Sequence, residues 1–347
     1  MKKSNAKPLK VLAVIPNKVN GVLYHRLLVP MTKLSEQGYN ITRVDNIDNV
    51  SDDLLKSFDL LVISRLEGIG DFDLQTKRLK EIAIPYILDI DDFWELPPNH
   101  LMHNDYKRAN AKLMITTMIS NAAHVWCATE HLVMHCLKYN DNVHHVPNAI
   151  DMDQPQWSKP EPQDRRMTFG WIGGIHHFDD LALMRETFIR LTADNIPMFL
   201  GGYKSGEPVW DVYKGWFTNY AMRPVTLHEA EDVYNYGRMY DHIDVLFAPL
   251  VDNEFNRCKS ELKMLEAGAK GVAFIGSDVM PYKNFGTKFN SVLVKNHNPG
   301  KNFYQAIKLL NSNPSMKDDM AAALKEDCEM YRPLWKSNEL RIQTMTA

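Results

Sequence analysis

The segment that decides the fold, residues 256–277, reads NRCKSELKMLEAGAKGVAFIGS. At about 100° per residue, Leu262, Leu265 and Ala269 fall on one stripe of a helix, which predicts an amphipathic helix over residues 259–267. A short apolar run follows Gly271 and predicts a strand at residues 272–275. A helix that leads into a buried strand is the repeating unit of a parallel α/β sheet.

The same alternation extends along the rest of the chain. Short apolar runs predict strands at residues 11–15, 40–44, 60–64, 86–89, 124–128, 167–172, 196–200 and 245–248. Helical spacing predicts helices at residues 71–82, 105–120 and 179–192. Residues 147–166 are rich in proline and have the composition of a linker. The predicted fold class is therefore α/β, with two doubly wound parallel-sheet domains.

Composition limits the possible functions. A chain of 347 residues is too long for one ordinary core, and 45% hydrophobic with 24% charged residues is typical of a folded globular protein. The net charge is −3, and residues 1–150 hold 17 Lys and Arg against 17 Asp and Glu. This balance argues against binding dominated by neutralisation of nucleic-acid phosphates.

The cysteines and the start of the chain predict a cytoplasmic location. Four cysteines are widely spaced and form no CxxC pair, which is typical of reduced thiols. The first apolar run has five residues before Pro16, too few for a signal peptide or a transmembrane segment.

A charged face lies beside the apolar stripe of the helix predicted first. Lys259, Lys263 and Glu266 fall within roughly 60° of arc. Two cations and a helix N-terminus suit a diphosphate, and a carboxylate can accept hydrogen bonds from the two hydroxyls of a ribose. The alternative is a surface helix with charge pairs three and four residues apart.

Three motifs, which follow one another along the chain in the family's order, resemble the retaining glycosyltransferases of family 4 and their relatives. They are the helix and strand at residues 265–277, the VPNAID junction at residues 146–151, and the approach to that junction, AAHVWCATEHLVMHCL, at residues 122–137. The resemblance implies the GT-B fold, in which two Rossmann-like domains face each other across a cleft. It also implies an acceptor-side domain at residues 1–146, a linker at 147–166, a nucleotide-sugar domain at 167–327, and a last helix at 328–347 that crosses back to the first domain.

The sequence departs from the family in two places. Cys258 stands where members carry a glutamate that contacts the donor sugar, so Glu254 or Glu261 is a candidate substitute. The Arg and Lys that follow the first strand of the donor domain in the family are also absent. Here the strand leads into FGWIGGIHHFDDL, residues 169–181, where Gly173 and Gly174 would let backbone N–H groups approach an anion.

Histidines and lysines are the candidates for the missing positive charge. In the turn after the glycines, His177 is favoured over His176 as a donor to a phosphate oxygen. Lys259 and Lys263 would supply the rest of the charge on the leaving diphosphate. Several aromatic residues lie between the two motifs and are interpreted as core packing, with stacking on a base or a sugar as the alternative: Trp210, Trp216, Tyr234, Tyr236 and Tyr240.

Two segments of the first domain are further candidates. Gly21 lies in the loop after the first strand, where the family places a glycine near the diphosphate, and Tyr24, His25 and Arg26 follow it. The segment LDIDDFWELPP, residues 88–98, contains three aspartates that suit a magnesium or manganese ion, an acceptor or catalytic role, or capping of the next segment. They are Asp89, Asp91 and Asp92.

Together these features predict a metal-independent, retaining hexosyltransferase whose substrate, a UDP- or GDP-linked sugar, takes the place of a cofactor. The predicted catalytic residues are Lys259, Lys263, His25 and Asp92. The predicted donor-binding residues are Gly21, Gly173, Gly174, His177, Lys259, Lys263 and Glu266. The acceptor hydroxyl belongs to a glycan, a lipid-linked sugar, a protein, or a hydroxymethylated base in DNA.

Two other classes of function are alternatives to a glycosyltransferase. A non-catalytic module that keeps the nucleotide pocket is an alternative, and Cys258 is its best support. A dinucleotide-dependent oxidoreductase is disfavoured because no G-x-G-x-x-G follows the first strand of either domain.

Overall fold

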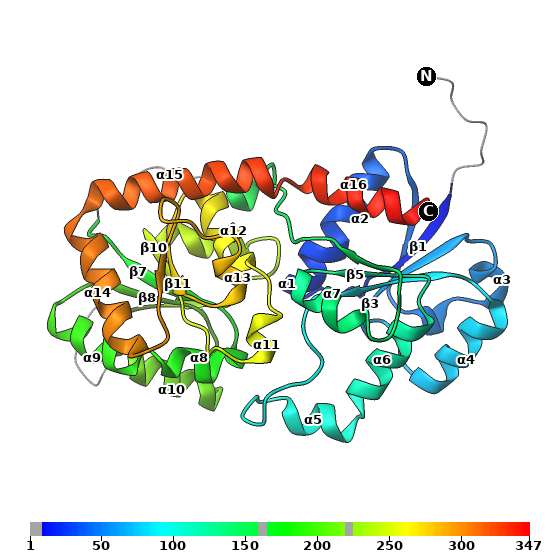
Figure 1. Ribbon diagram of the computed structural model, residues 1–347, viewed down its shortest axis with the longest axis horizontal. Coiled ribbons are helices and arrows are strands. Elements are labelled where there is room, and N and C mark those ends of the chain that lie inside the picture. The colour runs from blue at the N-terminus through cyan, green and yellow to red at the C-terminus, as the bar shows by residue number, and fades with distance from the viewer. Residues whose placement is uncertain (1–8, 159–164, 219–224) are drawn as a thin grey trace. The chain divides into compact units, whose positions relative to one another are not determined.

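The structure is a computed structural model that describes residues 9–158, 165–218 and 225–347. The chain divides into two units, each built on a six-stranded parallel sheet with helices packed on it (Figure 1). Unit 1 comprises Met1–Leu96, Met102–Asn148 and Leu334–Ala347, and unit 2 comprises Pro97–Leu101 and Ala149–Pro333. The predicted α/β class with two doubly wound parallel sheets is confirmed.

Unit 1 has the strand order β2-β1-β3-β4-β5-β6. Its strands are β1 (Lys10–Val14), β2 (Asn40–Val44), β3 (Leu60–Ser64), β4 (Tyr86–Ile90), β5 (His124–Cys127) and β6 (Val143–His145). Its helices are α1 (Gly21–Leu23), the π-helix η1 (Tyr24–Leu28), α2 (Val29–Glu36), η2 (Ile47–Asn49), α3 (Asp52–Leu55), α4 (Phe72–Ile82), α5 (His103–Arg108), α6 (Ala111–Asn121), α7 (Glu130–Cys136) and α16 (Leu334–Met345).

A buried arginine organises the centre of unit 1. Arg26 has no exposed surface and donates to both carboxylate oxygens of Asp89, at the end of β4, and to the carbonyl oxygen of Val146. Its Nη1 also donates to Asn148 Oδ1 at 3.2 Å, which anchors the VPNAID segment to the sheet. The last helix, α16, packs beside α2 (Figure 1), and its Arg341 donates to the carbonyl oxygen of Arg26 at 3.2 Å.

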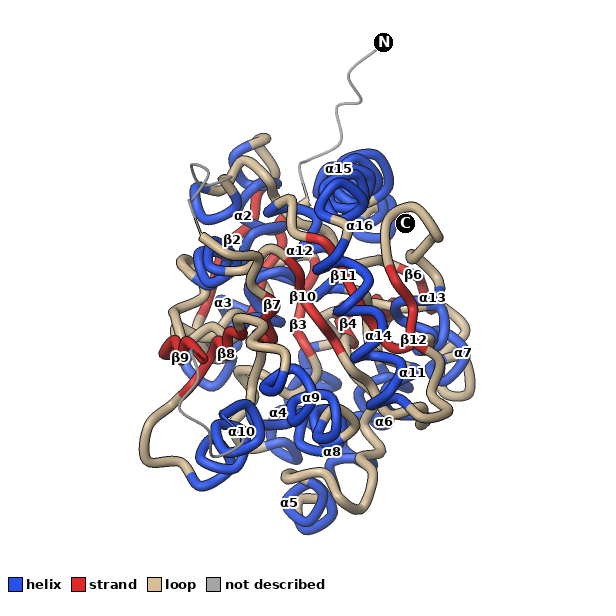
Figure 2. Tube along the Cα trace, turned by 90° about the vertical axis from the view of Figure 1, so that its left-hand side faces the viewer, coloured by secondary structure: helices blue, strands red, loops and turns tan. Residues whose placement is uncertain are grey.

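Unit 2 has the strand order β12-β11-β10-β7-β8-β9, with β9 and β12 at the two edges (Figure 2). Its strands are β7 (Phe169–Ile172), β8 (Met198–Tyr203), β9 (Val225–Glu229), β10 (Val245–Ala248), β11 (Ala273–Ser277) and β12 (Val292–Val294). Its helices are η3 (Pro155–Trp157), η4 (Ile175–His177), α8 (Phe178–Ala182), α9 (Arg185–Ala193), α10 (Pro208–Thr218), η5 (Tyr236–His242), α11 (Glu254–Arg257), α12 (Leu262–Lys270), α13 (Met280–Lys283), α14 (Pro299–Ser312) and α15 (Pro314–Tyr331).

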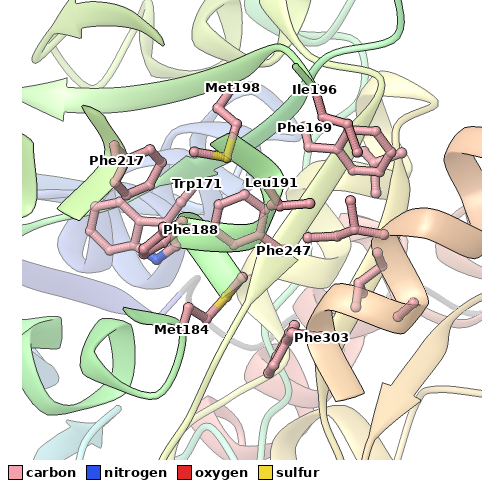
Figure 3. Packing of buried hydrophobic residues seen from close by; sticks show 14 of the residues in the cluster. Phe169, Trp171, Met184, Phe188, Leu191, Ile196, Met198, Phe217, Phe247 and Phe303 are labelled. Atoms are coloured by element: carbon pink, nitrogen blue, oxygen red, sulfur yellow. The ribbon is translucent and has the colours of Figure 1, made fainter. Parts of the chain in front are cut away.

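Both faces of this sheet carry a core. Val245 and Phe247 belong to the cluster on one face, and the alternate residues Leu246 and Ala248 belong to the cluster on the other. Figure 3 shows the first cluster, in which the rings of Phe188 and Phe217 have centroids 4.4 Å apart. Burial on both faces explains why the interior strands have continuous apolar runs.

The structure refines several predicted elements. The nine predicted strands are present within a few residues of their predicted bounds, whereas β6, β9 and β12 were not predicted. The helix predicted at residues 105–120 is split into α5 and α6 at Asn110, which has a φ of +49° and so cannot continue a helix. The helix predicted at 179–192 is likewise split, into α8 and α9.

The proline-rich segment is packed where the structure describes it. Trp157 is buried, and the buried Lys270 ammonium donates to the carbonyl oxygens of Gln156 at 3.0 Å and Ser158 at 2.6 Å. Residues 159–164 of the predicted linker lie outside the described residues, as do the lysines of residues 1–8.

Two helical glycines of unit 2, Gly268 in α12 and Gly215 in α10, are predicted to respond in opposite ways to alanine. A Cβ on Gly268 would overlap Cys328 Sγ and lie 3.1 Å from Leu324 Cγ, so Gly268→Ala should lower the free energy of unfolding by about 1–3 kcal/mol. A Cβ on Gly215, within α10, meets nothing within 4 Å, so Gly215→Ala should raise it by about 0.5–1 kcal/mol. Urea denaturation measures both; a lower midpoint for Gly215→Ala or a higher one for Gly268→Ala would contradict the packing.

Candidate functional site

The strand order of unit 2 marks where a ligand should bind. The chain adds β8 and β9 on one side of β7, and β10 to β12 on the other side, so its direction reverses between β7 and β10. In open parallel sheets, ligands bind beyond the carboxyl ends of the strands at this reversal point. The segments that follow β7 and β10 are the turn at residues 173–177 and α11 with its preceding loop.

Two glycines allow close approach at the end of β7. A Cβ on Gly202, whose φ is +88°, would overlap the carbonyl oxygen of Gly173. A Cβ on Gly173 would lie 2.9 Å from the Lys263 ammonium and 2.8 Å from the Trp171 ring. Gly173 therefore lets the start of α12 come against the end of β7, as only a residue without a side chain can. Gly174, by contrast, is exposed, and a Cβ there would meet open space.

Lys263 is the cation at the centre of this arrangement. Its Nζ donates to the carbonyl oxygen of Ile172 and lies 5.5 Å from the centroid of the Trp171 ring. Burial lowers the pKa of Lys263, while the nearby charges of Glu266 and Asp180 oppose that change. Lys259 lowers the pKa of Lys263 further, because two like charges repel.

Lys259 lies outside the helix in which it was predicted. Helix α12 begins at Leu262, not at Lys259, because the Asn253 side chain caps a separate short helix, α11, and the chain turns before α12 starts. Lys259 nevertheless stays in this site, with its Nζ 4.5 Å from the centroid of the Phe255 ring. A cation over an aromatic face at this distance contributes about 0.5–1 kcal/mol at an exposed site.

Glu266 is buried within α12, on the next turn after Lys263. Burial raises the pKa of Glu266, while the Lys263 charge and the hydrogen bond from Tyr240 act against that rise. The Tyr240 hydroxyl donates to Glu266 Oε2 at 2.6 Å. Tyr240, interpreted from the sequence as core packing, is indeed buried, and it also fixes this carboxylate.

A buried carboxylate that sequence reasoning did not single out joins the two loops. Asp180, in α8, accepts hydrogen bonds from the Val251 backbone N–H, from Asn256 Nδ2 and from His177, each at 2.8 Å. The only signal in the sequence was its place three residues after the IGGIHH turn, where an aspartate at a helix start is ordinary. Asp180 thus ties the segment after β7 to the segment after β10.

The pKa values of this pair define its protonation state. Burial would raise the pKa of Asp180, but the hydrogen bond and charge of His177 and the Val251 N–H leave it below its ordinary value. Burial lowers the pKa of His177 despite Asp180, and Lys259 and Lys263 lower it further. A neutral imidazole therefore donates from Nδ1 to a charged carboxylate. Because Nε2 then carries no proton, His177 donates to an anion only after gaining a second one.

The candidate substitutes for the missing glutamate differ in their surroundings. Cys258 is a fully buried thiol. Glu261 is buried and paired with Arg332 at 2.7 Å. Glu254 is exposed on α11, 3.8 Å from Arg257. Glu254 therefore remains the more accessible of the two carboxylates for a ligand.

The residues predicted near Gly21 lie in unit 1, after β1. Gly21 starts α1, where the Asn20 side chain accepts from the Leu23 N–H at 2.9 Å, and a Cβ on Gly21 would meet nothing within 4 Å. His25 lies in the π-helix η1, and burial lowers its pKa to about 4, which makes it neutral near pH 7. Arg26, predicted to line a site, is instead the buried partner of Asp89.

The three aspartates after β4 have separate environments. Asp89 has no exposed surface and is committed to Arg26. Asp91 is paired with Arg65 at 3.0 Å, and burial raises its pKa to about 6. Asp92 is partly exposed, and its charge, with that of Asp91, raises the pKa of Arg65 against the effect of burial. Arg65, missed from the sequence, has a φ of +43°, which is strained for a non-glycine residue.

Among the helices in the described parts of the chain, none combines the length and apolar character needed to cross a bilayer.

Solved structures show which fold this is. HepE from Anabaena, in complex with UDP and glucose, matches 98% of this chain over 100% of its own length, with a TM-score of 0.71 and 9% identity. Sucrose-phosphate synthase from Thermosynechococcus elongatus matches 97% of this chain and 98% of its own, with a TM-score of 0.71 and 11% identity.

A third similar structure is an alpha-glucosyltransferase in complex with UDP and a 13-mer DNA that contains an HMU base. It matches 98% of this chain and 100% of its own, with a TM-score of 0.70 and 12% identity. No protein-family profile and no curated protein sequence matches the chain. At these identities the similarity establishes the fold, and the chain has the GT-B fold of these glycosyltransferases.

The contacts of Asp180 predict that Asp180→Asn loosens the site. An amide cannot accept from both the Val251 N–H and the His177 Nδ1–H while its own NH₂ faces donors, so the free energy of unfolding should fall by about 1–3 kcal/mol at pH 7. Asp179→Asn, a substitution at the neighbouring residue, is the control and should have little effect.

The fall in the free energy of unfolding caused by Asp180→Asn should also depend on pH. Because the pKa of Asp180 is lower in the folded chain, its ionisation stabilises the fold above the ordinary Asp value and stops doing so as the pH falls through the folded pKa. The difference between wild type and Asp180→Asn in urea denaturation should therefore shrink below about pH 4. A difference that grows in acid would rule out a charged Asp180.

Proposed function

We propose that the chain is a glycosyltransferase that moves a hexosyl group from a UDP- or GDP-linked sugar to an acceptor hydroxyl, with retention of configuration and without a metal ion. One observation carries the proposal: the glycine turn after β7, Lys259, Lys263 and buried Glu266 come together at the reversal point of the sheet in unit 2. The GT-B fold supports it, since HepE, a structure of the same fold, holds UDP and glucose.

In the proposed complex, the diphosphate lies against the turn at Gly173 and Gly174. Backbone N–H groups of the turn, the ammonium groups of Lys259 and Lys263, and protonated His177 offset its charge. Fixed positive charge of this kind stabilises the negative charge that grows on a leaving oxygen. Glu266, held by Tyr240, accepts hydrogen bonds from the ribose hydroxyls.

The proposed transfer balances with no further reactant. The acceptor oxygen bonds to the anomeric carbon on the face from which the diphosphate leaves, the bond from that carbon to the phosphate oxygen breaks, and the acceptor proton passes to the departing phosphate. In unit 1, Gly21, His25 and Asp92 are the proposed acceptor-side residues. Neutral His25 can donate or accept a hydrogen bond at the acceptor hydroxyl. Of Asp91 and Asp92, Asp91 is better suited to hold a proton, because its pKa is raised to about 6.

The acceptor we favour is the hydroxyl of a glycan or of a lipid-linked sugar. The alternative with an observation behind it is a hydroxymethylated base in DNA, because a structure of the same fold is bound to DNA with an HMU base. A DNA acceptor should show turnover on a modified duplex that falls steeply with salt. Turnover on saccharide acceptors that is insensitive to salt would reject it.

The first test is a screen of nucleotides and nucleotide sugars. Thermal-shift measurement should give a higher Tm with one nucleotide diphosphate and its sugars, because a ligand that binds only the folded chain stabilises it. With that donor, transfer should persist in EDTA, and NMR should find the anomeric configuration of the donor kept in the product. Binding without transfer or hydrolysis would favour a non-catalytic module, and no binding to any nucleotide would reject the function.

Lys259→Ala should then separate activity from folding. Loss of one fixed charge on the leaving group should lower kcat by about 100-fold or more, while Tm changes little because the ammonium is not part of the core. Lys288→Ala is a matched control, since Lys288 is an exposed lysine of the same unit whose Nζ lies 4.9 Å from the ring of Phe289. Equal turnover in the two variants would remove Lys259 from the mechanism.

A further inference from the structure

Unit 2 contains five residues that are distant in sequence from the rest of it. Pro97–Leu101 come from the connection between β4 and α5, and they group with Ala149–Pro333. We call these five residues the strap. A turn shapes the strap, with the His100 N–H donating to the Pro97 carbonyl oxygen at 2.9 Å, and its two prolines restrict the backbone further.

The strap meets the proposed donor site through His100. The His100 ring stacks on His176, with centroids 5.5 Å apart and planes 10° from parallel. It also makes a T-shaped contact with Phe255, at 5.2 Å. His176 belongs to the glycine turn after β7, and Phe255 belongs to α11 after β10. One imidazole therefore touches both segments that flank the reversal point of the sheet.

Phe255 connects the strap to Lys259. The Phe255 ring is only 8% exposed, and the Lys259 ammonium lies 4.5 Å from its centroid. A ring held on one side by His100 presents a fixed face to the cation. Without His100 the ring would gain exposed surface and could adopt other rotamers, and the ammonium would follow it.

The strap is closely packed on this part of unit 2. The recess that it lines together with Asp179, Asp180, Asn253 and Asn256 has a volume of about 20 Å³. That is room for about one water molecule among polar side chains. The strap thus lines the same recess as Asp180, the carboxylate that joins the two loops.

We propose that the strap is a positioning element of the donor site, in which His100 holds Phe255 and His176 so that Lys259 and the glycine turn are set for a nucleoside diphosphate. This inference rests on the proposed function of the same site. His100 is a positioning residue, because it acts on the diphosphate through Phe255 and Lys259.

The test measures the affinity of the 347-residue chain for UDP by calorimetry. If the donor screen selects GDP, GDP replaces UDP. His100→Ala should weaken binding about five- to tenfold, the value of a lost pair of aromatic contacts. His100→Phe keeps a ring in place and should stay within about twofold of wild type. His297→Ala, which removes an exposed histidine between β12 and α14, is the matched control and should leave the affinity unchanged.

A double-mutant cycle separates positioning from general damage to the fold. If His100 acts in part through Lys259, His100→Ala should weaken UDP binding by a smaller factor in the Lys259→Ala background than in the wild-type chain. The donor KM of His100→Ala should rise by the same factor as its Kd, with a smaller change in kcat. Should His100→Ala fail to fold, His176→Ala removes the other ring of the stack at an exposed position and should weaken UDP binding in the same direction.

The outcomes distinguish the two proposals. A wild-type chain that binds no nucleotide rejects the proposed function. A wild-type chain that binds, with His100→Ala equal to His297→Ala, overturns the role of the strap alone. If His100→Ala weakens UDP binding by the same factor in the Lys259→Ala background as in the wild-type chain, His100 does not act through Lys259. Failure of His100→Phe to restore binding would show that the ring contacts are not what the strap supplies.

Discussion

The position of the Lys263 ammonium against the last carbonyl of β7 is the constraint on which the candidate site depends. A half-buried ammonium needs acceptors in place of water, and the Ile172 oxygen and the Trp171 face supply contacts. The position is available only because Gly173 has no side chain, since a Cβ there would lie 2.9 Å from the ammonium. One cation thereby joins the end of β7 and the adjacent glycine turn to α12, which is distant from both in sequence.

Asp180 connects the segment after β10 to the turn after β7. Its three hydrogen bonds reach the turn after β7, the backbone after β10 and the side chain of Asn256. The charge of Lys259 helps to lower the pKa of Asp180, and the charge of Asp180 opposes the fall in the pKa of Lys263 that burial causes. Two lysine ammonium groups gathered at the end of the sheet repel each other, and the nearby Asp180 carboxylate offsets part of that repulsion.

Most of the strands that the sequence predicts are buried on two faces, although the half-buried to exposed edge strand β2 is also predicted. The residues of β3, β4, β10 and β11 are all buried, and their largely apolar runs predict strands. The unpredicted strands β6, β9 and β12 are edge strands, largely half-buried or exposed, and polar residues such as His144 and His228 interrupt their patterns. Edge strands have one neighbour and one covered side at most, so their sequences carry a weaker signal.

The site divides in a similar way. Glu266 and Lys263 were predictable because helical periodicity places them on one face, and Gly173 because a glycine pair follows a strand. Asp180, Tyr240 and the strap were not, since each acts through a contact with a segment distant in sequence. Arg26 was a candidate for a site, and Asp89 was a candidate for a site or for capping the next segment, whereas in the structure they neutralise each other inside unit 1. Charge alone does not reveal whether its partner is a ligand or another side chain.

The charged helix face has two interpretations, a ligand site and a surface helix with charge pairs. The burial of Lys263 and Glu266 favours the ligand site. Pairs of charges on a surface helix remain hydrated, so their pKa values stay near the ordinary ones and each pair contributes only about 0.2–0.5 kcal/mol. Here burial lowers the pKa of Lys263 and raises that of Glu266, so each group is held in a place that disfavours its own charge. A fold gains no stability from charges placed in this way. A polyanion that met Lys263, and hydroxyl groups that met Glu266, would both favour the charged forms, and this supports the proposed binding of a nucleoside diphosphate here.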